Sequence, residues 1–386
     1  MSEWKEYKLG DLTVDGKGHY GIAAPAVDYD SSKYTYLRIT DINDDGTLNK
    51  QGLKSVDDVN AGKYLLKPND IVFARTGASV GRSYFYDGSD GDLVYAGFLI
   101  KFSLDPNKVN PYMLKLYTHS QDYYDWIKSV DNGATRGNIN ALTFASMPIV
   151  LPSRYEQDKI AGVLGALDDK IDLLNRENAT LEALAETLFR HYFIETPNPA
   201  WKEGKLGDEF DFTMGQSPSG DSFNEDGIGI PMYQGNADFG FRFPTRRVYT
   251  TAPTRFAEEN DTLISVRAPV GAQNMASERC CIGRGVAAFR HKDKSLYSYT
   301  YYKLKSLLED IRQFNDNGTV FGSISKSDFE NIDIVIPNRD SIVAFQEQAT
   351  PIDEKIRTNY KQILVLSAQR DSLLPRLMSG EVKHVE

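Results

Sequence analysis

Several polar groups in this chain have the residue types that catalysis uses, but not the spacing that it needs. Asp168-Asp169-Lys170 combines an acidic pair with a lysine, as some nucleases do, yet no Pro-Asp pair precedes it. The Gly-Lys pairs lack the Gly-x-x-x-x-Gly-Lys-Ser/Thr spacing of a phosphate-binding loop. No two prolines are adjacent, which removes the Pro-Pro motif of amino-methyltransferases, and the five histidines show no metal-ligand spacing. We therefore expect no catalytic residue and no metal site.

Composition narrows the class of protein further. The chain has 386 residues, of which 41% are hydrophobic and 25% charged, and this length favours two to three folded domains. The net charge of −10 argues against a uniformly basic coat for nucleic acid. The only cysteines, Cys280 and Cys281, are neighbours and predict neither a disulfide framework nor a Cys-type zinc site. Without an apolar run of membrane-spanning length or a signal-like start, we expect a cytoplasmic protein that does not contact membranes.

An internal repeat covers most of the chain. Residues 4–11 return as residues 201–208, an offset of 197, and Tyr36 and Asp41 recur as Tyr233 and Asp238. Near the end of each copy the offset is 185, over the matched residues Gly133, Gly137, Ile139, Phe144, Ile149, Pro152 and Gly318, Gly322, Ile324, Phe329, Ile334, Pro337. We interpret the chain as a tandem duplication whose second copy has lost about a dozen residues from its middle.

The first part of each copy, residues 1–153 and 197–338, is rich in glycine, aromatic residues and short strand-like runs. Residues 34–39, 70–74 and 331–336 are examples of such runs. Between them we expect a helix over 111–128, with Leu114, Tyr117, Tyr124 and Ile127 as its core contacts. These segments predict two mixed α/β domains.

The second part of each copy, residues 154–196 and 339–386, predicts a long helix with apolar residues every three and four positions. Two such stripes in one chain most simply pair antiparallel, which would give the molecule a pseudo-twofold axis. Asn178 and Arg370 fall on the stripes; Asn178 could fix the register, whereas we expect Arg370 to extend outward from a frayed end. Asp168-Asp169-Lys170 lies on the first helix and is predicted to be a solvated face. The predicted seam residues are Leu164, Leu167, Ile171, Leu174, Leu181 and Leu188 with Ile352, Ile356, Ile363, Leu366, Leu373 and Leu377.

This order of globular domain and long helix, repeated once, resembles the specificity (S) subunits of type I restriction-modification systems. Local strings are also similar to that family: residues 4–11, Asp70 to Gly77 with Val80 to Arg82, 188–193 at the end of the first helix, and 373–381 at the end of the second. The ordered set spans essentially the whole chain. The second copy departs from the pattern at Arg267-Ala268-Pro269, where the first has Arg75-Thr76-Gly77.

The resemblance implies that each globular unit is a target-recognition domain that reads one half of a bipartite DNA sequence. The helices would then space the two units and bind two adenine-N6 methyltransferase subunits. The family holds S-adenosylmethionine on the methyltransferase subunits, and restriction subunits that use ATP and Mg²⁺ also join. The resemblance thus implies double-stranded DNA as a partner and no cofactor on this chain.

Given that resemblance, base reading would need side chains with directional donors and acceptors. In the first unit we expect these on two glycine-bounded loops, as Arg75, Thr76, Gly77, Ser79 and Arg82 with Arg136 and Asn138. The alternative for Arg75 and Arg82 is an ion pair with Asp70 or Asp87 at the domain surface. The alternative for the glycines is that they only supply the positive φ of a turn and do not contact DNA.

In the second unit the corresponding candidates are Arg267, Gln273, Asn274 and Ser323. Arg242, Arg246 and Arg247, beside Phe241 and Phe243, form the densest basic and aromatic cluster of this unit, which we interpret as a solvated hairpin.

Charge leaves a second class of function open. Residues 1–150 and residues 197–337 each carry 16 basic and 19 acidic side chains, so neither globular part is basic as a whole. This balance favours an adaptor that holds two protein or glycan ligands on a coiled-coil spacer, whereas the ordered family strings favour a DNA specificity subunit. If the chain is such a subunit, we expect it to bind DNA weakly on its own, because the methyltransferase would supply much of the electrostatic attraction.

Overall fold

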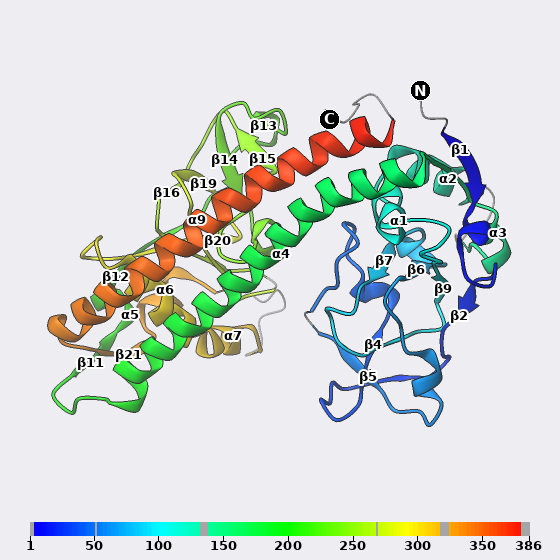
Figure 1. Ribbon diagram of the computed structural model, residues 1–386. Coiled ribbons are helices and arrows are strands. Elements are labelled where there is room, and N and C mark those ends of the chain that lie inside the picture. The colour runs from blue at the N-terminus through cyan, green and yellow to red at the C-terminus, as the bar shows by residue number, and fades with distance from the viewer. Residues whose placement is uncertain (1–3, 51, 132–137, 268, 317–323, 380–386) are drawn as a thin grey trace. The chain divides into compact units, whose positions relative to one another are not determined.

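The computed structural model describes residues 4–50, 52–131, 138–267, 269–316 and 324–379. The chain divides into two compact units, residues 1–173 with 363–386 and residues 174–362. Each unit holds one globular domain and a part of both long helices, α4 (Arg154–Arg190) and α9 (Arg339–Met378) (Figure 1). Among the described helices, none combines the length and the apolar character that a membrane crossing requires.

The first globular domain consists of two four-stranded sheets, a two-stranded ribbon and three helices. Its sheets have the strand orders β2-β9-β6-β7 and β3-β5-β4-β8, and β1 pairs with β10. The strands are β1 (Lys5–Lys8), β2 (His19–Tyr20), β3 (Ala26–Val27), β4 (Tyr34–Leu37), β5 (Lys54–Val56), β6 (Asp70–Ala74), β7 (Ser83–Tyr86), β8 (Leu93–Tyr95), β9 (Leu99–Ser103) and β10 (Pro148–Leu151). The helices are α1 (Pro111–Tyr117), α2 (Gln121–Asp131) and α3 (Ala141–Ala145).

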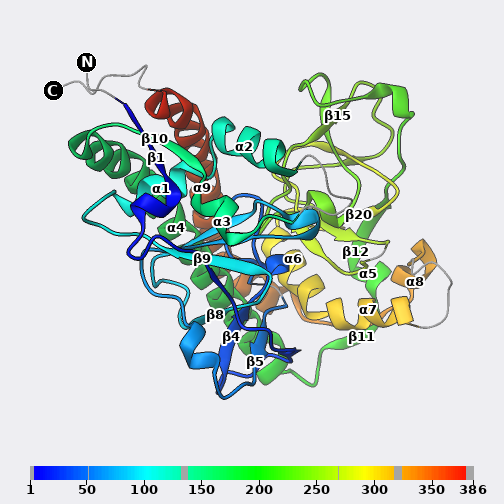
Figure 2. The same ribbon diagram turned by 90° about the vertical axis from the view of Figure 1, so that its right-hand side faces the viewer.

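The second domain repeats this topology with one further strand, β16, at the edge of its second sheet. Its sheets have the orders β12-β20-β17-β18 and β13-β15-β14-β19-β16, and β11 pairs with β21. Helix α6 packs against β17 and β20 (Figure 2). The elements are β11 (Lys202–Lys205), α5 (Leu206–Glu209), β12 (Phe210–Met214), β13 (Phe223–Asn224), β14 (Ile230–Tyr233), β15 (Val248–Thr250), β16 (Phe256–Ala257), β17 (Thr262–Ser265), β18 (Gln273–Met275), β19 (Cys280–Ile282), β20 (Val286–His291), α6 (Tyr297–Ser306), α7 (Leu308–Asp316), α8 (Lys326–Glu330) and β21 (Asp333–Ile336).

Several residues that recur in the sequence repeat stabilise turns of the backbone. Asp11 and Asp208 accept hydrogen bonds from the backbone N–H of Lys8 and Lys205, three residues earlier. Asp41 and Asp238 cap turns in the same way, as do Asp70 and Asp261. Asn69 and Asn260, which directly precede Asp70 and Asp261, both adopt positive φ, at 75° and 73°. These strings recur because both domains need the same local turns.

The prediction of one helix over 111–128 is wrong in one respect, because this segment forms two helices, α1 and α2. At the break the Thr118 hydroxyl donates to the Lys115 carbonyl and the Ser120 hydroxyl donates to the Tyr117 carbonyl. These side chains compete with the helical backbone hydrogen bonds. The break changes the phase of the second helix, so that Tyr123 is fully buried and Tyr124, the expected core residue, is 40% exposed.

The predicted seam between the long helices is confirmed within each unit. In the second unit Asn178 lies opposite Asn359, and just after the end of α4 the Tyr192 hydroxyl accepts a hydrogen bond from the Gln348 amide, so the two helices run antiparallel there. In the first unit Leu164 and Leu377 belong to one hydrophobic cluster. All the predicted apolar seam positions, including Ile171, Ile363 and Leu366, are buried or half-buried.

Two expectations about polar residues on these helices are wrong. Arg370 does not extend into solvent; its guanidinium contacts Asp168 at 3.1 Å and also pairs with Asp371. Asp168 is not part of a solvated face, because it also accepts hydrogen bonds from the Tyr112 hydroxyl and the Lys115 ammonium. Burial raises the pKa of Asp168, but Lys115, Tyr112 and Arg370 together lower it below its ordinary value. The first domain is thereby joined to both helices by charged groups.

Candidate nucleic-acid interface

In the first domain, the loop from Arg75 to Arg82 leaves the buried strand β6 and returns as β7. Its neck is closed by backbone hydrogen bonds from Ala74 N to Arg82 O and from Gly81 N to Ala74 O, at 2.8 and 3.0 Å. Gly81 has φ of 84°, and a Cβ there would lie 2.9 Å from the Ile127 side chain. Gly77 also has positive φ but faces open space. The loop therefore has a fixed neck and an exposed tip.

Arg75 brings the two predicted loops of this domain together. Its guanidinium donates to the Asn138 side-chain carbonyl through Nε and Nη2, at 3.3 and 3.1 Å. The guanidinium also lies over the ring of Tyr20, 4.9 Å from its centroid. The Ile139 N–H donates to the Arg75 carbonyl at 2.9 Å. Arg75 is thus held by an aromatic face and an amide, and the alternative pairing with Asp70 or Asp87 does not form.

Arg82 pairs with an acid at the surface, although not with the acids expected. Its Nε lies 2.6 Å from an Asp44 carboxylate oxygen, and its Nη1 donates to the Ile42 carbonyl at 3.1 Å. Asp44 is largely exposed, so this ion pair is at the domain surface. Of the other loop residues, Thr76 and Ser79 are half-buried and Gly77 is exposed, whereas Arg136 lies outside the described residues.

Tyr20 and Phe98 belong to the same surface but were missed by sequence reasoning. Tyr20 is 43% exposed, and its hydroxyl accepts a hydrogen bond from the Ala141 N–H. Phe98 is 60% exposed, and its carbonyl accepts a hydrogen bond from the Arg75 N–H at 3.1 Å. Gly97 before Phe98 was a weak signal for an exposed turn.

The second domain has the same backbone frame but different side chains. Here Val266 occupies the place of Arg75, because its N–H donates to the Gly285 carbonyl at 2.9 Å and its carbonyl accepts from the Ile324 N–H at 3.3 Å. Arg267 follows and is exposed. The predicted residue Ser323 lies outside the described residues.

Asn274 and Gln273 do not present their side chains to solvent as the sequence suggested. Asn274 is fully buried, and its Nδ2 donates to the carbonyls of Gly240 and Gln273. The Gln273 amide donates to the Tyr301 carbonyl at 2.7 Å. Asn274 in this position holds a loop from inside the domain and does not reach a ligand outside it.

The interpretation of Arg242 as part of a solvated hairpin is wrong. Its side chain is 2% exposed, 3.8 Å from the Tyr301 ring centroid, and its Nη2 contacts Asp353 at 2.6 Å and Glu182 at 3.0 Å. Burial disfavours its charge, but Asp353, with Tyr301, Tyr302 and Glu182, raises the pKa of Arg242 well above its ordinary value. Arg246 and Arg247 do remain near the surface, paired with Glu278 and Asp238.

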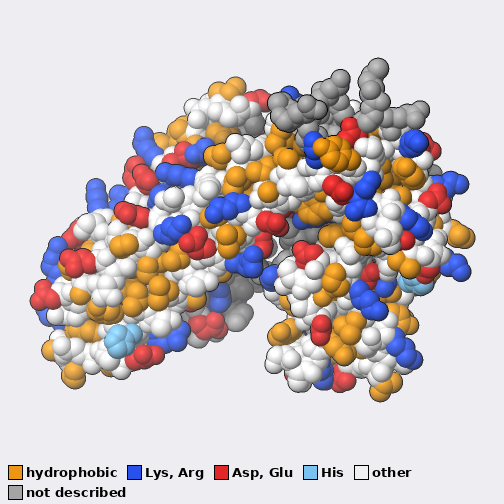
Figure 3. Space-filling view, in the orientation of Figure 1, with side chains coloured by type: hydrophobic (Ala, Val, Ile, Leu, Met, Phe, Trp, Pro, Cys, Tyr) orange, Lys and Arg blue, Asp and Glu red, His pale blue; other side chains and the backbone are white. Residues whose placement is uncertain are grey.

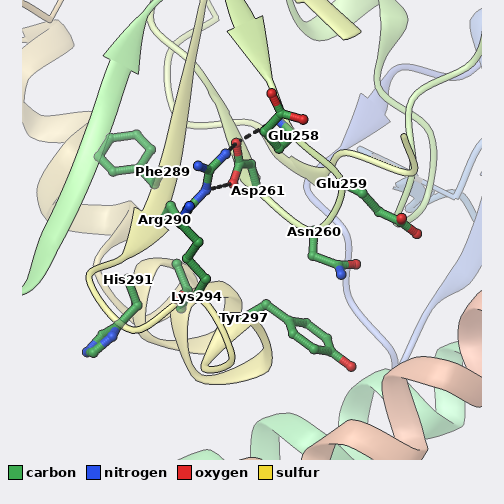
Figure 4. Close-up of a pocket in the computed structure, with 10 residues that line it drawn as sticks. Glu258, Glu259, Asn260, Asp261, Phe289, Arg290, His291, Lys294 and Tyr297 are labelled. Atoms are coloured by element: carbon green, nitrogen blue, oxygen red, sulfur yellow. Dashed lines mark hydrogen bonds and ion pairs between the residues drawn. The ribbon is translucent and has the colours of Figure 1, made fainter. Parts of the chain in front are cut away.

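A cavity of about 150 Å³ beside β17 and β20 holds several charged groups (Figure 4). At its wall Arg290 donates to both carboxylate oxygens of Asp261, at 2.6 and 2.5 Å. Burial raises the pKa of Asp261, although Arg290 opposes that effect. Asp261 also caps the turn before β17, as Asp70 does before β6. Asp261 and Arg290 therefore stabilise the turn before β17. Among the described residues, no group of His, Cys, Asp and Glu side chains could hold a metal ion.

Comparisons with known proteins agree with this organisation. The family model for the type I restriction modification DNA specificity domain matches residues 1–183 and 198–363. A provisionally named specificity subunit of the type I restriction enzyme MjaX from Methanocaldococcus jannaschii is 28% identical over 377 residues, covering 92% of this chain and 88% of the relative. The type I restriction enzyme HindI specificity subunit of Haemophilus influenzae is 22% identical and covers 99% of this chain and 100% of its own.

A solved structure shares the fold. The crystal structure of the type I restriction-modification system S subunit from M. genitalium aligns with a TM-score of 0.59 at 18% identity, over 97% of this chain and 96% of that one. The duplicated domains, the paired helices and the two-part family match lead to one conclusion. The chain belongs to the type I restriction-modification DNA specificity family, and it is the DNA specificity subunit, a non-catalytic component, of such a system.

Proposed function

We propose that each globular domain reads one half of a bipartite DNA target, and that the two helical segments set the gap between the halves. One observation carries this proposal. The two domains share the backbone hydrogen bonds around Arg75 and Val266, yet the side chains attached to that frame differ. A shared frame with different side chains is what two readers of different half-sites need.

In the first domain, the proposed contacts to double-stranded DNA are Arg75, Thr76, Gly77, Ser79, Arg82 and Asn138. Arg75 is the leading candidate for a base contact, because Tyr20 and Asn138 already orient its guanidinium. In the second domain the proposed contact is the exposed Arg267, which directly follows Val266, the residue in the place of Arg75. Lys/Arg and Asp/Glu side chains are interspersed on the face shown in Figure 3, so positive charge there is local.

We further propose that α4 and α9 bind two adenine-N6 methyltransferase subunits, which hold S-adenosylmethionine, and that restriction subunits using ATP and Mg²⁺ join them in the cytoplasm. The methyltransferase subunits would add positive charge along the DNA, which would compensate for the acidic balance of this chain.

The test is reconstitution of this chain with its cognate methyltransferase. The mass of the purified complex should correspond to two methyltransferase subunits per chain. The complex should then methylate, in a library of random duplexes, those with two short half-sites at a fixed gap. Methyltransferase alone is the control and should show no such motif. A single continuous motif would contradict bipartite reading, and methylation without sequence preference would contradict the specificity role.

A further inference from the structure

We propose that the turn before β9 and the matching turn before β20 are specificity-determining elements, which present Phe98 in the first domain and Arg284 in the second to DNA bases. This inference rests on the proposed function and extends it to a segment that lies outside the loops predicted from the sequence. Its basis is the position of the two turns, their contact with those loops, and the different side chains at their tips.

The two turns have the same backbone. In the first domain the Leu99 N–H donates to the Ala96 carbonyl at 2.8 Å, and in the second the Val286 N–H donates to the Gly283 carbonyl at 3.0 Å. The residues between them are Gly97-Phe98 and Arg284-Gly285. Each turn therefore has a glycine and one large side chain at its tip, in opposite order.

Both turns are fixed at two sides. On one side, Ala96 N donates to the Leu37 carbonyl at the end of β4, and Gly283 N donates to the Tyr233 carbonyl at the end of β14, at 3.0 and 2.8 Å. On the other side, the carbonyls of Phe98 and Gly285 accept from the N–H groups of Arg75 and Val266. Each turn is thus held between its neighbouring strand and the candidate loop, so that its tip lies beside the proposed DNA contacts.

The tip side chains face solvent. Phe98 is 60% exposed beside Arg75, and Tyr20 next to them is 43% exposed. A single exposed apolar residue is ordinary on a protein surface. Here one exposed ring, Tyr20, lies under the Arg75 guanidinium, and a second, Phe98, belongs to the residue that bonds to the Arg75 backbone. Exposed aromatic rings on residues that contact a partly exposed arginine resemble the amphipathic surfaces that contact bases.

In the second domain three arginines gather around the turn. Arg284 is at its tip, Arg267 follows the residue that bonds to Gly285, and the Arg255 carbonyl accepts from the Ile282 N–H just before the turn. All three are exposed, and within the described part of the chain none of their guanidinium groups forms a hydrogen bond or an ion pair. Free exposed guanidinium groups are suited to guanine edges and phosphates.

The different tips predict different base contacts. An arginine donates two hydrogen bonds to the major-groove edge of guanine, which is the commonest specific contact. A phenylalanine forms an apolar contact with the methyl group of thymine. The same turn can therefore select different bases in the two half-sites without any change of the backbone.

The experiment compares Phe98→Ala and Arg284→Ala in the complex of this chain with its methyltransferase, using duplexes that carry every single-base change in both half-sites. Phe98→Ala should weaken discrimination by about tenfold or more at one base position of one half-site, and Arg284→Ala should do so in the other half-site only. Each variant thus contains its own control, the half-site read by the unchanged domain. Tyr29→Ala, an aromatic residue 57% exposed in the first domain, and Arg279→Ala, which removes a surface ion pair with Glu258, should leave discrimination unchanged.

The outcomes separate the inference from the proposed function. If the wild-type complex shows no split motif, the proposed function itself fails. If the wild type reads a split motif but neither tip substitution alters discrimination at any base, the inference alone is overturned. A uniform loss of methylation across all duplexes would also overturn it, because that pattern indicates a phosphate contact or a folding defect. Thermal unfolding of each variant identifies the folding defect.

Discussion

Two arginines of this chain, Arg75 and Arg242, have opposite surroundings. Arg75 is partly exposed and rests on Tyr20, with its guanidinium directed to the neutral amide of Asn138. Arg242 is 2% exposed and is neutralised by Glu182 and Asp353. A guanidinium that is oriented but not neutralised keeps its charge for a ligand, whereas the enclosed one holds its domain against the helices.

At Arg75 we predict a loss of base discrimination. Arg75→Ala should cost about 1–3 kcal/mol at one base position if the guanidinium reads guanine. The measurement is the methylation rate of duplexes with single substitutions, by the complex with the variant chain. Equal loss on every duplex would instead indicate a phosphate contact, and unchanged rates would exclude Arg75 from the interface.

At Arg242 we predict a loss of stability. Arg242→Met leaves the buried carboxylate of Asp353 without its cation, whereas Glu182 keeps its ion pair with Lys305. The loss at Asp353 should lower the free energy of unfolding by about 3–5 kcal/mol. Arg246→Met is the matched control, because its ion pair with Glu278 is near the surface and should contribute no more than about 1 kcal/mol. Urea unfolding of both variants tests this difference. Equal stability of the two variants would show that the buried cluster does not hold the second domain.

The sequence made the Arg75 loop a candidate because glycines and arginines are neighbours in the chain. It could not find Tyr20, which reaches Arg75 from a strand more than fifty residues earlier, nor the burial of Arg242, whose partner Asp353 lies 111 positions away. Such neighbours are set by sheet order and by domain docking, which local patterns do not encode.

In the long helices, too, the sequence predicted features set by neighbouring residues but not contacts between residues far apart in the chain. Their seam was predictable because a heptad period repeats along each helix. Seam residues Asn178 and Asn359 bond to each other at 2.9 Å, which supports the expected role of Asn178 in fixing the register. The pairing of Arg370 with Asp168 joins residues 202 positions apart, and the sequence therefore suggested a solvated arginine instead.

Breaking α4 should uncouple the half-sites. Proline at Ala183, an exposed position inside α4, removes a backbone donor and clashes with the preceding turn, at a cost of about 3 kcal/mol or more. The complex with Ala183→Pro should lose methylation of a target with a fixed gap, whereas Ala183→Ser should retain it. A normal bipartite target for the proline variant would contradict a helical spacer.

The contact between the first domain and the helices should weaken in acid. The folded chain lowers the pKa of Asp168, so the stabilisation is present above the ordinary value of about 3.8 and is lost as the pH falls through the folded-state pKa. At neutral pH Asp168→Asn should therefore cost about 1–3 kcal/mol, and wild type and variant should become equally stable at low pH. Urea unfolding between pH 7 and pH 3 measures this, and a difference that persists undiminished at pH 3 would exclude the mechanism.

At the scale of the whole molecule, duplication has produced two domains with one topology and different surfaces. Aspartate caps and positive-φ asparagines are shared, whereas the tips differ, with Phe98 in one domain and Arg284 in the other. The net charge of −10 indicates that the chain as a whole does not attract DNA over long distances.

The purified chain alone should therefore bind DNA weakly, and the complex with methyltransferase tightly. Fluorescence anisotropy over a range of salt concentrations should show a steeper salt dependence for the complex, because it neutralises more phosphates. Equal affinity and equal salt dependence would show that this chain supplies the electrostatic attraction by itself.

The central claim is that this chain selects the sequences that its system methylates. The most direct test is the genome-wide pattern of adenine methylation in cells that carry the cognate methyltransferase, with this gene, without it, and with it restored. We predict that one split motif, two short half-sites around a fixed gap, disappears with the gene and returns on restoration. An unchanged methylation pattern in cells shown to express the whole system would contradict the claim.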